Sequence, residues 1–145
     1  MAEDDGTLSD LERKALKERT AELRKQSGRK GGTKKEKDLK DVLDTIEGLP
    51  EPDRAIAQMI HEAVTEVAPE LDPKTWYGFP AYARDGKVVV FYQQASKFDA
   101  RYGTLGFQDD AKLDDGAMWP ASFAIVEVTD AVRTRVKELI GKAVG

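Results

Sequence analysis

Every aromatic residue of this 145-residue chain, two tryptophans, four tyrosines and five phenylalanines, lies between positions 76 and 123. Aromatic side chains favour β-strands, because they pack well on a pleated, partly buried surface. The segments on either side instead carry aliphatic side chains at helical spacing. This segregation predicts an α+β domain in which helices with aliphatic stripes pack on a ring-rich sheet.

Three segments outside the aromatic region have the apolar periodicity of helices. A stripe at i, i+3, i+4 and i+7 indicates a helix over residues 34–48, and a longer stripe indicates a second helix over residues 52–68. A closing helix is expected over residues 131–143, with Thr129 or Asp130 as its N-cap. These helices supply the layer that covers the sheet.

About four strands are expected in the aromatic region. Pro80 cannot donate a ladder hydrogen bond, so the first strand is predicted to be an edge strand or to carry a bulge. Asp85-Gly86 is typical of a two-residue hairpin turn. Strands joined by turns pair antiparallel, and helices are expected on one face of the sheet only. The expected strands cover residues 75–83, 87–94, 97–107 and 122–129.

Charge divides the chain into a basic arm and an acidic body. Residues 13–40 hold 12 Lys or Arg against 4 Asp or Glu, a local charge of +8, and the rest of the chain sums to −12. We therefore divide the chain into residues 1–37, a charged arm with a helix over residues 10–25 and a flexible basic linker, and residues 38–145, the folded domain. The arm favours a polyanion or an acidic protein as partner. It contains no aromatic residue for base stacking, so nucleic acid is not expected.

The composition narrows the classes of chemistry that the chain can perform. With no cysteine there is no disulfide, no thiolate nucleophile and no zinc site that needs sulfur. His61 is the only histidine, and we interpret it as a boundary or surface residue rather than a general base. No stretch of about 18 apolar residues is present, so a cytoplasmic protein with no membrane role is expected. A binding domain is favoured over an enzyme.

Two sets of residues are candidates for a site. Asp109, Asp110, Asp114 and Asp115 are close in sequence, and their carboxylates can attract a hard cation, with a solvated turn as the alternative. Among the rings, Trp76, Tyr82 and Trp119 are expected to line a groove, because helices cover only one face of the sheet. The alternative is that all the rings belong to the core.

The residues W-Y-G-F-P-A-Y-A-R-D-G-K-V-V-V-F at positions 76–91, D-D-G-A-M-W-P at 114–120 and the closing helix resemble the bacterial YdhG-like family of domains of unknown function. The resemblance covers residues 39–144. It implies helices packed on one antiparallel sheet, and for some members a frataxin-like role in which surface carboxylates bind iron for iron–sulfur or haem assembly. The four aspartates are chosen for their clustering and not from the family.

The leading expectation is a non-catalytic binding domain, with frataxin-like iron handling as one hypothesis and iron as the one cofactor considered. A module that binds a small molecule in an aromatic groove is the first alternative. The second is an interaction protein that acts through the basic arm.

Overall fold

The computed structural model describes residues 32–145. The helix expected over residues 10–25 and most of the basic arm lie outside this range, and the expected boundary at residues 37 and 38 falls within the first described helix. The elements in chain order are α2 (Gly32–Glu47), α3 (Asp53–Val67), β1 (Asp72–Trp76), β2 (Phe79–Arg84), β3 (Lys87–Gln93), the 3₁₀ turn η1 (Ala95–Lys97), β4 (Gly103–Phe107), β5 (Ser122–Ile125) and α4 (Asp130–Ala143).

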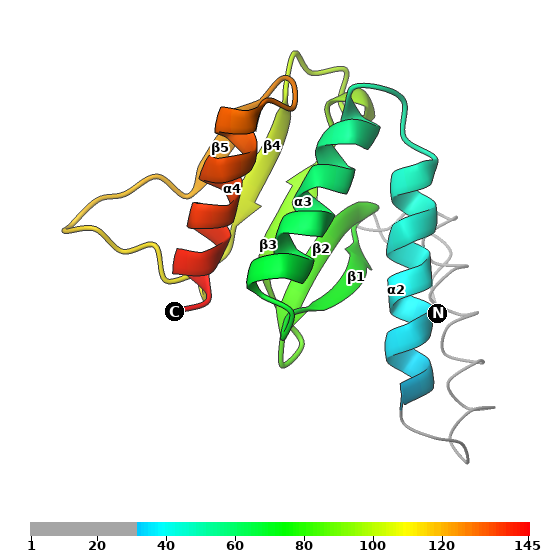
Figure 1. The fold of residues 1–145 in the computed structure, drawn as a ribbon, viewed down its shortest axis with the longest axis horizontal. Helices are drawn as coiled ribbons and strands as arrows, with labels where there is room; N and C mark the ends of the chain where they lie inside the picture. The colour runs from blue at the N-terminus through cyan, green and yellow to red at the C-terminus, as the bar shows by residue number, and fades with distance from the viewer. Residues whose placement is uncertain (1–31) are drawn as a thin grey trace, which may run out of the picture.

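The five strands form one antiparallel sheet in the order β1-β2-β3-β4-β5, so each strand pairs with the next one in the chain. The helices α2, α3 and α4 lie on one face of this sheet, with α3 between the other two (Figure 1). The predicted α+β architecture, with one covered face, is confirmed. The sheet has five strands where about four were expected.

The additional strand arises from a turn inside the segment that was predicted to be a single strand. Residues 75–83 are interrupted by Tyr77 and Gly78, both at positive φ (53° and 81°). Positive φ at both central residues of a two-residue loop produces a tight hairpin, so β1 and β2 pair with Trp76 opposite Phe79. The single-strand prediction was wrong because a tyrosine at positive φ is uncommon and gives no turn signal in the sequence.

Other local predictions are confirmed, with shorter strands than expected. Asp85 and Gly86 also have positive φ (53° and 82°) and join β2 to β3 as a hairpin. Pro80 lies in an inner strand, but pairing of β2 with β3 begins only at Ala81 and shifts register after Tyr82, so no ladder bond is lost. The hydroxyl of Thr129 accepts a hydrogen bond from the Val132 N–H and caps α4.

The core lies between the covered face and the three helices. Aliphatic stripes from the helices meet inward side chains from the strands, and two of these, Tyr82 and Tyr92, are completely enclosed. Both buried hydroxyls find partners on α3, which satisfies the polar end of each ring. Within residues 32–145, none of the helices combines the length and the hydropathy needed to cross a bilayer.

Candidate functional site

A pocket lies where the long connection between β4 and β5 passes α4. This connection, residues 108–121, extends away from the body of the domain (Figure 1). The backbone N–H of Lys112 donates to the carbonyl of Ala143 at 2.8 Å, which fixes the base of the loop against the end of α4. The pocket encloses about 180 Å³. Its lining residues are Leu113, Asp115, Trp119, Pro120, Phe123, Arg135, Glu138, Leu139 and Lys142.

The inner part of the pocket is apolar. Leu113 and Leu139 are only 5% and 7% exposed, and both belong to the hydrophobic core or its border. Trp119 and Phe123 pack against that core but remain partly exposed. The Phe123 ring meets the edge of Phe107 at a centroid distance of 6.2 Å, which holds it in place on β5. The inner part of the pocket is therefore lined by two buried leucines and two partly exposed rings.

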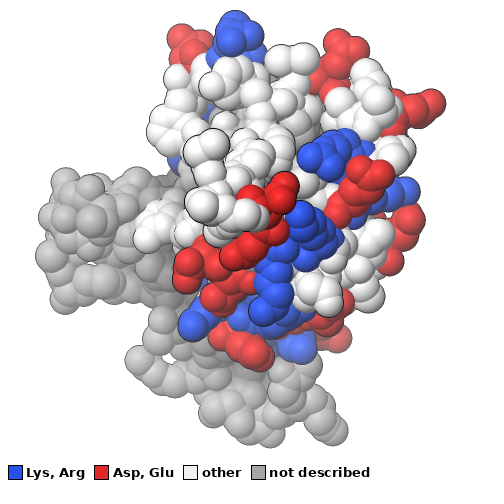
Figure 2. Space-filling view, turned by 90° about the vertical axis from the view of Figure 1, so that its left-hand side faces the viewer, with Lys and Arg blue, Asp and Glu red and all other residues white. Residues whose placement is uncertain are grey.

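The rim of the pocket carries charges of both signs. Arg135 and Glu138 on α4 are 3.6 Å apart and form an exposed ion pair. Asp115 on the loop and Lys142 on α4 form no ion pair with each other or with any other residue among 32–145. Figure 2 shows this side of the molecule, where a broad uncharged area borders a band in which basic and acidic side chains alternate.

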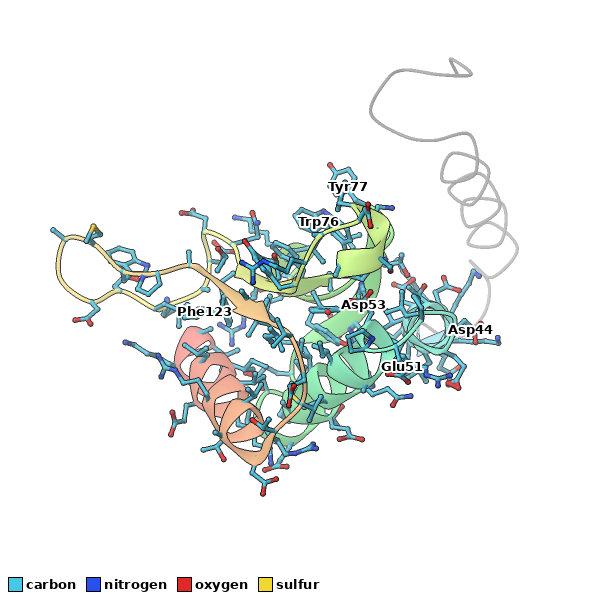
Figure 3. The ribbon with its side chains drawn as sticks, turned by 90° about the horizontal axis from the view of Figure 1, so that it is seen from above. Asp44, Glu51, Asp53, Trp76, Tyr77 and Phe123 are labelled. Carbon is cyan, nitrogen blue, oxygen red and sulfur yellow. The ribbon has the colours of Figure 1, made fainter. Side chains whose placement is uncertain are left out.

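The three rings predicted to line one groove lie in three different places. Trp119 lines the pocket, whereas Tyr82 is completely enclosed beneath α3. Trp76 is partly buried on the opposite face of the sheet, away from the helices (Figure 3). The hairpin at Tyr77 and Gly78 places Trp76 opposite Phe79, and alternation along β2 then directs Phe79 and Tyr82 to different faces. The structure does not bring these rings together.

A row of rings occupies the uncovered face. The centroid distances are 5.0 Å from Tyr77 to Trp76, 5.3 Å from Trp76 to Phe91, 6.0 Å from Phe91 to Phe79 and 6.3 Å from Phe79 to Phe98. The rings at the two ends, Tyr77 and Phe98, are 52% and 56% exposed. These distances are typical of attractive aromatic pairs, so neighbouring rings of the row stabilise one another. The rings at the two ends remain largely in solvent.

The four aspartates proposed as metal ligands all lie exposed along the 108–121 loop. Across residues 32–145, no group of three or more His, Cys, Asp or Glu side chains lies close enough to hold a metal ion. Asp115 lines the pocket, and Asp109, Asp110 and Asp114 do not.

His61 is part of the core boundary. Its Nδ1 lies 3.0 Å from the hydroxyl of Tyr82, and the two groups form one hydrogen bond. Burial raises the pKa of Tyr82, so its hydroxyl stays protonated. Burial lowers the pKa of His61, and the nearby charge of Glu62 only partly opposes this. The Nδ1 atom of His61 is therefore already engaged in a hydrogen bond at the edge of the core.

Asp53 at the start of α3 is a buried carboxylate that sequence reasoning missed as a key residue. It accepts hydrogen bonds from the Tyr92 hydroxyl (2.7 Å) and from the backbone N–H groups of Ala95 (2.8 Å) and Ser96 (3.0 Å). Burial alone raises the pKa of Asp53, but these hydrogen bonds outweigh it, and the pKa is lowered. Asp53 thus joins α3 to β3 and η1, a structural role.

The charged pocket residues were also not singled out from sequence. Arg135, Glu138 and Lys142 flank the apolar stripe of α4 and look like any solvated helix face. A comparison with the known protein families, with curated proteins and with solved structures finds no match.

Proposed function

We propose that this domain is a non-catalytic binding module that takes a small organic molecule in the pocket beside Trp119. The observation that supports this most is the combination of an apolar floor, an accessible indole ring and charged groups at one rim. Binding sites for small molecules are characteristically concave and mostly apolar, with a few polar groups that orient the ligand.

The size of the pocket limits the ligand. A volume of about 180 Å³ is below the roughly 300–1,000 Å³ of pockets that bury drug-sized molecules. The ligand is therefore a metabolite of a few heavy atoms whose apolar part contacts Trp119 and Leu139. A larger ligand such as a dinucleotide would extend beyond the pocket into solvent.

The pocket is tested by titrating the protein with a broad panel of small metabolites and recording amide and indole N–H chemical shifts. A ligand of the pocket shifts the Trp119 indole and residues 113–123 and 135–142. Trp119→Ala should abolish these shifts, whereas the matched variant Trp76→Phe, on the opposite face, should preserve them. If no member of the panel shifts these residues at millimolar concentration, the proposed function is wrong.

Iron handling and a role for the basic arm remain hypotheses that rest on the sequence. Residues 32–145 contain no group of side chains that could hold a metal ion, so the structure does not support iron handling. Most of the basic arm lies outside the described residues, so the structure does not support a role for it either. The small-molecule function is the one that the pocket geometry favours.

A further inference from the structure

We infer that the molecule bound beside Trp119 is a zwitterion of the amino-acid type, with a short apolar side chain. This inference rests on the proposed function, because it names the chemical class of ligand for the same pocket. The inference follows from the charges at the rim of the pocket, the apolar side chains of its floor and its volume.

The pocket presents one unpaired charge of each sign. Asp115 comes from the loop and Lys142 from α4, and neither is within 4.0 Å of an opposite charge among residues 32–145. The Arg135–Glu138 pair on the same rim is already internally neutralised. A ligand carbon that bears both a carboxylate and an ammonium group can pair with Lys142 and Asp115 simultaneously.

A ligand with only one charge satisfies the rim less well. A ligand with only a carboxylate can pair with Lys142, but it is repelled by the Asp115 carboxylate. A ligand with only an ammonium group can pair with Asp115, but it is repelled by the Lys142 ammonium. Like charges at close range are repulsive, so each singly charged ligand loses part of what it gains. The lining as a whole carries two basic and two acidic side chains, which favours a ligand with no net charge.

The floor of the pocket selects an apolar side chain. Trp119, Phe123 and Leu139 offer ring and methyl surfaces, and no polar side chain lies among the buried lining residues. The pocket volume of about 180 Å³ is small for a ligand site. A branched aliphatic amino acid such as leucine is of this size, whereas a peptide or a nucleotide is not.

The test uses the full chain carrying Trp76→Phe, so that fluorescence reports Trp119 alone. Three probes share one side chain: leucine with both charges, 4-methylpentanoate with the carboxylate only, and 3-methylbutylamine with the amine only. Leucine should bind about 1.5- to fivefold more tightly than either analogue, the range expected for one additional exposed ion pair.

Two charge-removing variants then give a crossed pattern. Lys142→Met should weaken leucine and 4-methylpentanoate but not the amine, and Asp115→Asn should weaken leucine and the amine but not the acid. The matched controls are Asp110→Asn, in the same loop but outside the pocket, and Lys87→Met, at the β2–β3 turn. Neither control should change any affinity, and all four positions are exposed, so the variants are expected to fold.

The outcomes separate the two proposals. If the singly charged probes bind as tightly as leucine, or if Lys142→Met and Asp115→Asn leave leucine binding unchanged, the zwitterion inference is overturned while the pocket stands. If neither these probes nor the broader panel perturbs Trp119, both proposals are overturned. The crossed pattern with silent controls supports both.

Discussion

The two faces of the sheet solve the same packing problem in different ways. On the covered face, Tyr92 lies over Gly103, and its hydroxyl is bound to Asp53 beneath the helices. On the uncovered face, the adjacent residue Phe91 lies over Gly106 and contacts other rings, and the helices of residues 32–145 lie on the other side of the sheet. The covered face is held by hydrogen bonds and burial together. The uncovered face is held mainly by ring contacts, with the Lys97 ammonium 5.7 Å from the centroid of the Phe79 ring.

This contrast shows that the rings serve two purposes. Those on the covered face are enclosed and fix α3 on the sheet, and those at the ends of the uncovered row remain in solvent. The effect of removing a ring should therefore depend on its face more than on its size.

The largest expected effect compares neighbouring residues of β3. Tyr92→Ala should lower the free energy of unfolding by about 3–5 kcal/mol, because it leaves a cavity and removes one of the three hydrogen bonds to the buried Asp53 carboxylate. Phe91→Ala should cost only about 1–2 kcal/mol, since part of the ring is already solvated. Urea denaturation followed by circular dichroism measures both. Equal losses would mean that another part of the chain or a second molecule covers the open face in solution.

The next effect exchanges the glycines beneath these two rings. A Cβ at Gly103 overlaps the Tyr92 hydroxyl, which cannot move without breaking its bond to Asp53, so Gly103→Ala should cost about 2–3 kcal/mol. A Cβ at Gly106 overlaps the Phe91 ring, which can swing into solvent, so Gly106→Ala should cost about 1 kcal/mol. Thermal unfolding measures the stability of both variants. If Gly106→Ala loses more stability than Gly103→Ala, the expectation that Phe91 can move and Tyr92 cannot is wrong.

Acid should destabilise the covered face specifically. The pKa values of His61 and Asp53 are both lower in the folded protein than in the unfolded chain, so the unfolded chain binds more protons as the pH falls. Stability should decline first below about pH 6.5, as His61 begins to titrate, and again below about pH 4, as Asp53 does.

Two variants assign these steps. The free energy of unfolding is measured with urea from pH 7 to pH 3. In His61→Gln, its decline below about pH 6.5 should disappear. In Asp53→Asn, the decline below about pH 4 should disappear, and this variant should also be less stable at pH 7 by about 2 kcal/mol. Trp76→Phe, on the uncovered face, should leave both steps in place. If His61→Gln and Asp53→Asn both leave the pH dependence of stability unchanged, other groups are responsible for it.

The smallest effect concerns the loop, which belongs to neither face. Hard cations need several oxygen ligands, and no such group is found among residues 32–145. The double variant Asp114→Asn and Asp115→Asn should therefore change ferrous iron affinity, measured by calorimetry, by less than about twofold, while it weakens leucine binding. A loss of iron affinity larger than about tenfold would revive the metal-binding hypothesis for this loop.

Local chemistry accounts for the elements that the sequence predicted well. The stripes of α3 and α4, the Thr129 cap and the hairpin at Asp85 and Gly86 each depend on residues only a few positions apart. The turn at Tyr77 could not be predicted in this way, because a tyrosine at positive φ is uncommon and the Asn-Gly or Asp-Gly signal of such turns is absent.

The candidate site was only partly predictable for a related reason. Trp119 was singled out as an exposed ring, but its neighbours Arg135 and Lys142 come from a helix that follows later in the chain. Which charged side chains of α4 face the loop depends on how that helix packs, and periodicity alone does not give this. The error at Trp76 and Tyr82 has the same origin as the missed turn, since a two-residue break changes the face of every residue after it.

The meander order of the sheet has a consequence for folding kinetics. Because each strand pairs with its sequence neighbour, the sheet can grow by closing one loop after another, the longest being residues 108–121 between β4 and β5. The entropic cost of closing a loop rises only slowly with its length. The contact between α3 and α4 is different, since it joins segments on either side of the entire sheet. Docking of α4 is therefore expected late on the folding pathway, and the pocket beside Trp119 would form only in that last step.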